Sequence, residues 1–186
     1  MSAFLIACHS DGKVRVEVRN ISTDTIRRDD STAKEVGVLV GGAVMYPGKA
    51  ILENLSTSLN HKILTQLLKG ADLLDTVSDK SLVTVFAPTD SAFNALPHNS
   101  LNMLNDKNNN LKRVLAYHVV EGHYELSDLK DGMVLKSIEG EQLKVSIKNN
   151  KIYINNASID VQDVISSNGV IHVINSVLMP PKNSKS

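Results

Sequence analysis

Hydrophobic residues between positions 51 and 68 recur at spacings of three and four residues, the period of an α-helix with one buried face. The apolar positions of this stripe are Ile51, Leu52, Leu55, Leu59, Ile63, Leu64, Leu67 and Leu68. They predict two helices packed on a core. Ser58 or Asn60 can cap the second helix, and Gly70 with Asp72 ends it before a further short helix at residues 73–77.

A predicted strand passes directly into a predicted helix near the middle of the chain. Residues 82–87 are β-branched and aromatic, which favours a strand, and Pro88 ends it because proline has no amide proton for the ladder. Thr89 and Asp90 follow. Their side-chain oxygens can accept hydrogen bonds from the free amides of a helix that carries Phe93.

The second half of the chain changes from helical to strand patterns. Helices are predicted at residues 100–104 and 109–116, and residues 117–120 are predicted to be extended. Short apolar or alternating runs then predict strands at residues 134–137, 142–147, 151–154, 159–163 and 170–177. Asn149-Asn150 and Asn168-Gly169 suit tight turns. Helices early and strands late, without regular alternation of the two, favour an α+β sandwich.

Composition favours one folded globular domain. Of the 186 residues, 42% are hydrophobic and 22% are charged, which fits a chain with a single core. Lysine plus arginine equals aspartate plus glutamate, and no basic run gathers along the sequence, so nucleic acid is not an expected partner. No run approaches the roughly 20 apolar residues that a spanning helix needs.

Residues 1–36 are predicted to be a separate N-terminal segment and polar tether. Within it, Leu5-Ile6-Ala7-Cys8 resembles a bacterial lipobox, and diacylation of Cys8 would hold the chain at a membrane. The alternative is a frayed apolar terminus with a free thiol. Residues 13–19 alternate as a strand does, and they can either add to the edge of the domain or stay flexible.

Three segments, taken in order, carry a resemblance to a known family. They are Thr84-Val85-Phe86-Ala87-Pro88-Thr89-Asp90-Ser91-Ala92-Phe93, then Tyr117-His118, then Asn168-Gly169-Val170-Ile171-His172-Val173-Ile174-Asn175. Together they closely resemble the fasciclin-type domain (beta-Ig-H3/fasciclin), with its two signature motifs and the tyrosine-histidine motif between them. The resemblance covers roughly residues 38–181, and Gly41-Gly42 with Met45-Tyr46-Pro47 is similar to the start of bacterial single-domain members.

The resemblance implies a fasciclin-like twisted β-sandwich with flanking N-terminal helices. The domain would occupy residues 37–181, followed by a tail at residues 182–186. Its structural signature residues would be Thr84, Phe86, Pro88, Thr89, Asp90, Phe93, Asn168, Gly169 and His172. The resemblance also makes Tyr117 and His118 candidate partner-binding residues, while packing alone would equally explain both.

No pattern in the chain points to catalysis, a metal ion or a cofactor. Thr89 and Asp90 are explained by helix capping, and the chain has no nucleophile elbow. His118 and His123 are separated by an extended segment and a turn, which is not the spacing of a helical ligand pair. His172 lies on an apolar strand face, so we expect a buried imidazole with hydrogen-bond partners.

We therefore expect a non-enzymatic, monomeric adhesion module in the cell envelope, either anchored to the outer membrane through Cys8 or secreted. Its expected partner is a surface protein or a polysaccharide, and membrane contact is expected only through the lipid anchor. The alternative function is a cell-envelope carrier or sensor of a small ligand, with an apolar pocket between the sandwich and the helices.

Overall fold

The computed structural model describes residues 36–70, 82–98, 100, 104 and 110–181. Several predictions lie outside the described residues. They concern Cys8 and the lipobox-like segment, residues 13–19, the short helix at residues 73–77, most of the helix at residues 100–104, and the tail at residues 182–186.

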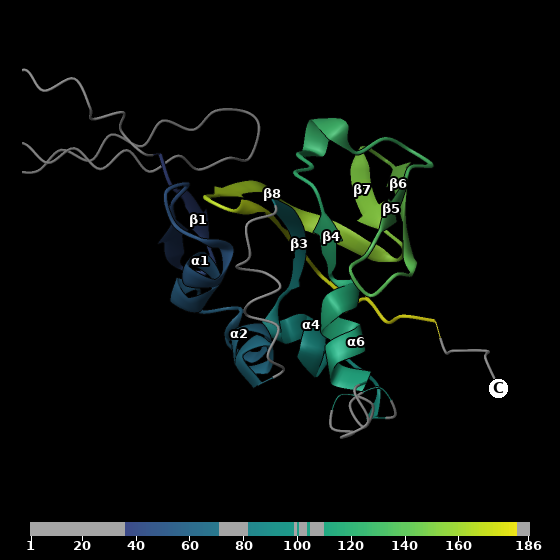
Figure 1. The fold of residues 1–186 in the computed structure, drawn as a ribbon, viewed down its shortest axis with the longest axis horizontal. Helices are drawn as coiled ribbons and strands as arrows, with labels where there is room; N and C mark the ends of the chain where they lie inside the picture. Colours follow the sequence, from purple (N-terminus) through teal and green to yellow (C-terminus); the bar gives the residue numbers. More distant parts are fainter. Residues whose placement is uncertain (1–35, 71–81, 99, 101–103, 105–109, 182–186) are drawn as a thin grey trace, which may run out of the picture.

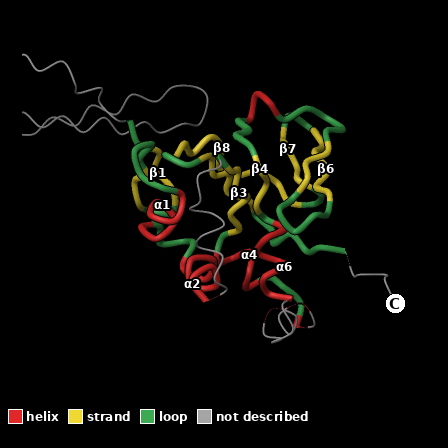
Figure 2. Tube along the Cα trace, viewed as in Figure 1, coloured by secondary structure: helices red, strands yellow, loops and turns green. Residues whose placement is uncertain are grey.

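The protein is α+β, as the sequence predicts. Its helices are α1 (Ile51–Thr57), α2 (Lys62–Gly70), α4 (Asp90–Asn94) and α6 (Asn110–Tyr117), with a short 3-10 helix η1 (Leu126–Asp128). Its strands are β1 (Val38–Val40), β2 (Ala43–Met45), β3 (Val83–Pro88), β4 (Val119–Glu121), β5 (Val134–Lys136), β6 (Gln142–Lys148), β7 (Lys151–Ile154), β8 (Ala157–Ser166) and β9 (Gly169–Ile174). The α-helices of the described residues lie along one side of the molecule, and β5, β6 and β7 lie at the other end (Figures 1 and 2).

Seven strands form one sheet in the order β4-β3-β9-β8-β7-β6-β5, while β1 and β2 form a separate hairpin. The sheet curls until its two edge strands meet. Val120 of β4 forms an isolated antiparallel bridge with Ser137, just after β5, and the Ile138 amide donates to the Val119 carbonyl at 2.8 Å. The predicted twisted sandwich is thus confirmed, in the form of a nearly closed barrel.

Two apolar cores lie on the two faces of this sheet. Alternation along β3 sends Val83, Val85 and Ala87 into the core that the helices cover, whereas Phe86 enters the core inside the curled sheet. All six residues of β3 and all six of β9 are buried. A strand covered on both faces is therefore a continuous apolar run, and this explains why residues 82–87 carry a strong signal in the sequence.

The region around Tyr117 differs from its prediction. The sequence predicts residues 117–120 to be extended, but Tyr117 is the last residue of α6, and β4 begins at Val119. Val114, Leu115 and Tyr117 are the buried side chains of this helix. Their packing on both cores outweighs the local preference of a tyrosine next to valines for a strand.

The capping of α2 also differs from its prediction. Neither Ser58 nor Asn60 supplies the cap. Instead, the Asp90 carboxylate accepts from the amides of Lys62 at 3.3 Å and Ile63 at 2.9 Å. Thr89 alone caps α4, through a 3.3 Å bond from the Ala92 amide to its hydroxyl. The two adjacent polar residues therefore fix the starts of two different helices.

The turn between β6 and β7 is the tight turn that the sequence predicts. Asn149 and Asn150 both have positive φ, at 49° and 61°. This is the backbone of a two-residue hairpin that follows the right-handed twist of its strands. It sets the register in which Lys148 lies opposite Lys151.

The Asn168-Gly169 turn brings the two signature motifs together. The Asn168 side-chain oxygen accepts from the Ile51 amide at 2.8 Å and so caps α1, while its carbonyl accepts from the Val83 amide at 3.1 Å. Gly169 then begins β9 against Val83 in parallel register. A Cβ on Gly169 would lie 1.8 Å from the Val83 carbonyl oxygen, and its φ of +150° is rare for other residues. Only glycine fits this contact.

We predict that Gly169→Ala lowers the free energy of unfolding by roughly 3 kcal/mol or more, because backbone atoms of the central strand must move to admit the methyl group. Gly70→Ala is the control, since a Cβ there meets nothing within 4 Å and a change below about 1 kcal/mol is expected. Urea unfolding of both variants measures the difference. Equal stabilities would contradict the proposed contact.

Candidate interaction site

Thr84, a signature residue of β3, holds a loop across the sheet. Its hydroxyl donates to the Gly122 carbonyl at 2.8 Å and accepts from the Tyr124 amide at 2.9 Å. Thr84 is fully buried, so both of its hydrogen bonds lie inside the protein. The loop that Thr84 holds comprises residues 122–128, and we refer to it as the 122–128 loop.

His172, opposite Phe86 in the neighbouring strand β9, holds the same loop. It is fully buried, as its strand position predicts, and its ring stacks on Phe86 with centroids 5.7 Å apart. Nδ1 accepts from the Asp163 amide at 3.3 Å, so Nε2 carries the proton that bonds to the Tyr124 carbonyl at 2.8 Å. Burial is the main cause that lowers the pKa of His172, partly opposed by the Tyr124 carbonyl.

A bulge in β8 gives the loop a third point of attachment. The pairing of β8 with β9 shifts between Val161 and Val164, and Asp163 within the bulge has a φ of 53°. Its carboxylate accepts from the Leu126 amide at 2.7 Å. Thr84, His172 and Asp163 together fix the 122–128 loop through their hydrogen bonds to its backbone.

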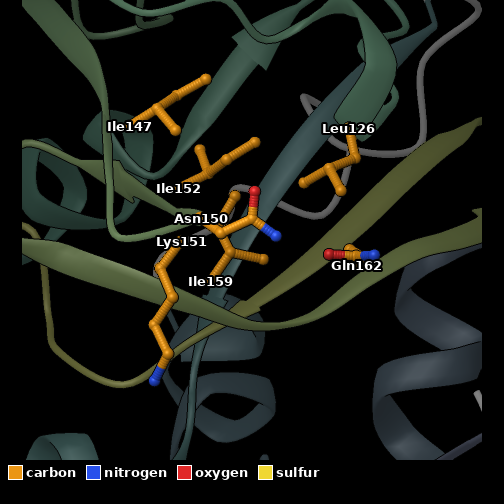
Figure 3. A pocket seen from close by; sticks show the side chains of 7 residues that line it. All are labelled: Leu126, Ile147, Asn150, Lys151, Ile152, Ile159 and Gln162. Atoms are coloured by element: carbon orange, nitrogen blue, oxygen red, sulfur yellow. The ribbon is translucent and has the colours of Figure 1, made fainter. Parts of the chain in front are cut away.

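A surface cleft of about 350 Å³ lies beside this loop, open on one side (Figure 3). It is lined by Leu126, Ile147, Asn150, Lys151, Ile152, Ile159 and Gln162. Leu126 comes from the 122–128 loop, and the other six come from the β6–β7 hairpin and from β8. We call this feature the loop–hairpin cleft.

The loop–hairpin cleft combines apolar walls with a few polar groups. Its walls are the four aliphatic side chains, and Figure 3 shows Asn150 lying among them. The amides of Asn150 and Gln162 can each donate and accept hydrogen bonds. An apolar hollow with a few polar groups at its rim suits a side chain or a sugar ring of a partner.

This cleft is not evident in the sequence, because its residues come from three separate segments. One sequence pattern does point toward the cleft. Leu143, Val145 and Ile147 form one apolar face of β6 that continues to the hairpin tip. The first two are buried, whereas Ile147 is 41% exposed.

Tyr117 lies inside the protein and not on an open surface. Its side chain is part of the core inside the curled sheet, and the residue is 3% exposed. Its hydroxyl donates to the Gln142 carbonyl at 2.8 Å and accepts from the Asn155 side chain at 3.0 Å. Burial raises the pKa of this hydroxyl. Tyr117 therefore joins α6 to the strands that carry the cleft.

His118 is also buried, at 1% exposure, and it joins α6 to the C-terminal segment. Nε2 accepts from the Leu178 amide at 2.9 Å, so Nδ1 carries the proton that bonds to the Val114 carbonyl at 2.7 Å. Burial lowers the pKa of His118 from 6.5 to about 4. Neither His118 nor Tyr117 lines the loop–hairpin cleft. Partner binding by these two residues stays a prediction.

A serine and a histidine lie together at the entry to α2. Ser58 Oγ is 2.8 Å from His61 Nδ1, and the two residues are 3% and 0% exposed. Ser58 Oγ also accepts from the Asn60 amide at 3.3 Å. Burial lowers the pKa of His61 despite the nearby Asp90 carboxylate. The arrangement fixes the chain between α1 and α2, because Ser58 Oγ bonds to both His61 Nδ1 and the Asn60 amide, whereas His61 Nε2 is buried without a hydrogen-bond partner among the described residues.

Within the part of the chain that the structure describes, no three His, Cys, Asp or Glu side chains come together where they could hold a metal ion. The described helices likewise include none that is both long and apolar enough to cross a membrane.

Comparison with known proteins assigns the fold to a family. The family model of the fasciclin domain matches residues 59–180. Protein sll1483 of Synechocystis sp. is 34% identical over 159 residues, which cover 84% of this chain and 88% of that protein. The chain belongs to the fasciclin domain family.

Other relatives are animal and mycobacterial proteins. The transforming growth factor-beta-induced protein ig-h3 of Sus scrofa is 34% identical over 74% of this chain, but the match spans 20% of that longer protein. The immunogenic protein MPB70 of Mycobacterium bovis is 31% identical over 67% of this chain and 63% of that protein. A FAS1 domain pair from the insect cell adhesion molecule fasciclin I shares the fold, with a TM-score of 0.55 and 17% identity over 79% of this chain and 59% of that chain.

We predict that acid destabilises the fold through its buried histidines. Because the pKa of His118 is about 4 in the folded state and 6.5 when unfolded, the unfolded chain binds more protons between these values. The contribution of neutral His118 to stability is therefore complete above pH 6.5 and is lost as pH falls toward 4. His118 alone should lower the free energy of unfolding by about 2 kcal/mol between pH 7.5 and 5.

Denaturant unfolding of His118→Asn across this pH range measures the effect. The variant should be less stable than the parent at pH 7.5, since the Leu178 amide loses its acceptor, yet its stability should fall less toward pH 5. Tyr117→Phe is the control, because it removes hydrogen bonds without removing a group that titrates in acid. Parallel curves for His118→Asn and the parent would refute the role of His118.

Proposed function

We propose that the chain is a non-catalytic interaction module that works outside the cell and binds a partner at the loop–hairpin cleft. This proposal rests on one observation: both walls of the cleft are held in place by the protein itself. Thr84, His172 and Asp163 hold one wall, and the tight Asn149-Asn150 turn holds the other. A surface that is already ordered loses little entropy on binding.

Family membership supports an adhesive role. Fasciclin I, whose domains share this fold, is a cell adhesion molecule of insects. The partner proposed here is a surface protein or a polysaccharide, because the cleft offers aliphatic walls and amide groups and is too open to enclose a molecule.

Tyr117 and His118 are proposed to support binding indirectly. Asn155, which donates to Tyr117, also accepts from the Lys144 amide at 2.9 Å within the strands that carry the cleft. Loss of the Tyr117 hydroxyl would thus loosen the β6–β7 hairpin. Under this proposal a change at Tyr117 affects partner binding through the position of Ile147 and Ile152.

A small-ligand carrier is the second candidate function. The same cleft favours it, since about 350 Å³ lined by four aliphatic side chains falls within the range of ligand pockets. The cleft is open on one side, however, so a small ligand would keep part of its surface in water. The proposal of an adhesive function fits this open shape better.

We predict that Ile147→Gln weakens adhesion at least about fivefold with little loss of stability, because Ile147 is 41% exposed and lines the cleft. Leu39→Gln is a matched control, since Leu39 is 43% exposed on β1, which contributes no residue to the cleft. Beads coated with each chain are allowed to settle on cell surfaces, and the fraction retained under shear is measured. Retention of the parent at the level of uncoated beads would reject adhesion. Equal retention of Ile147→Gln and the parent would reject the cleft as the site.

Attachment to the outer membrane through Cys8 is the location we propose in finer detail. The Leu5-Ile6-Ala7-Cys8 sequence supports it by its similarity to a lipobox. Intact-mass spectrometry of the protein from its native host should show a diacylglycerol adduct on Cys8. An unmodified thiol would leave secretion as the route out of the cell.

A further inference from the structure

The outer face of β5, β6 and β7 gathers four lysines. Side chains alternate across a strand. Leu135, Leu143 and Val145 point into the core of the curled sheet and are buried. The exposed positions of opposite parity hold the four lysines: Lys136, Lys144, Lys148 and Lys151. We call this surface the lysine face. The three strands that carry it lie at the end of the molecule away from α1 and α2 (Figure 1).

The strand register brings these charges together as two pairs, one near each end of β6 and about 13 Å apart along the strand. Lys148 lies directly opposite Lys151 across the hairpin, and Lys144 lies opposite Val134, two residues from Lys136. Cross-strand neighbours are about 5 Å apart at Cβ, and like charges placed opposite each other destabilise a sheet. The lysine face therefore lowers the stability of the free domain, and an anion bound there would offset this repulsion.

Three acidic groups of this region bond to groups other than the lysines, and a fourth, Glu141, is exposed directly before β6. Glu139 pairs with Arg113 at 2.8 Å, the Asp131 carboxylate accepts from the Ile147 amide at 2.8 Å, and Asp160 accepts from the Ser158 hydroxyl at 3.0 Å. No ion pair within the described residues involves any of the four lysines. The zero net charge of the whole chain hides this local excess of positive charge.

The chemistry of the lysine face favours a particular anion. It has no arginine, the residue whose planar fork suits phosphate groups best. Half-buried Tyr153 lies on the same face, opposite Ser146 and two residues from Lys151. A tyrosine ring flanked by ammonium groups offers a platform for a sugar ring next to a carboxylate.

We propose that the lysine face binds an acidic polysaccharide, one that carries carboxylate groups along its chain. This inference rests on the extracellular function proposed above and adds a second binding surface to it, with a partner class of its own. The lysine face and the loop–hairpin cleft are separate surfaces on the two sides of one hairpin. Lys151 lines the edge of the cleft, but its side chain runs away from the four aliphatic residues (Figure 3).

The test measures binding of the full chain to polygalacturonate, with uncharged dextran as the reference, by calorimetry at low and high salt. Lys136→Gln/Lys144→Gln/Lys148→Gln removes three charges from the lysine face. Lys62→Gln/Lys69→Gln/Lys112→Gln is the matched control, because it removes the same charge from exposed positions on α2 and α6. Single-stranded DNA and vesicles with phosphatidylglycerol are tested in parallel.

The proposal expects binding to polygalacturonate but not to dextran, weakened roughly tenfold or more by the first triple substitution and by higher salt. The control triple should change affinity less than about twofold. Absence of polygalacturonate binding, or equal weakening by both triples, would overturn the proposal. Tighter binding of DNA or vesicles than of polygalacturonate at equal salt would reassign the lysine face to that partner.

The bead assay separates this proposal from the adhesive function. Loss of adhesion in Ile147→Gln together with unchanged polygalacturonate binding would show two independent surfaces, as proposed. Adhesion without any polygalacturonate binding would overturn the lysine face alone and leave the adhesive function standing.

Discussion

The contact between Gly169 and the backbone of Val83 is the constraint on which the rest of the structure depends. It starts the parallel pairing of β3 and β9 in one register, and that register places Phe86 opposite His172. A parallel pair needs a long connection between its strands, and here that connection contains most of the barrel. A side chain at position 169 would separate the strands at the point where Asn168 also caps α1.

Four of the signature residues act in pairs across this contact. Thr84 and His172 hold the 122–128 loop, whereas Asp90 and Asn168 fix the starts of α2 and α1. Their polar atoms are used for hydrogen bonds within the protein. The exposed residues that this frame supports can therefore change without disturbing it, so one framework can carry different surfaces.

The sequence predicted those features whose physical cause is local. The positive φ values at Asn149-Asn150 follow from the two asparagines themselves, and the burial of His172 follows from its apolar strand neighbours. The cap that Asp90 provides was missed because its partners lie 27 and 28 residues earlier in the chain. The cleft and the lysine face were missed for a related reason, since both depend on how strands pair and not on the order of residues.

The bridge between Val120 and Ser137 has a consequence for association between molecules. By joining β4 to the segment after β5, it covers backbone groups that an open sheet would present to a neighbouring chain. A neighbouring chain therefore cannot pair with the sheet where Val120 meets Ser137, and what it contacts at this place is side chains.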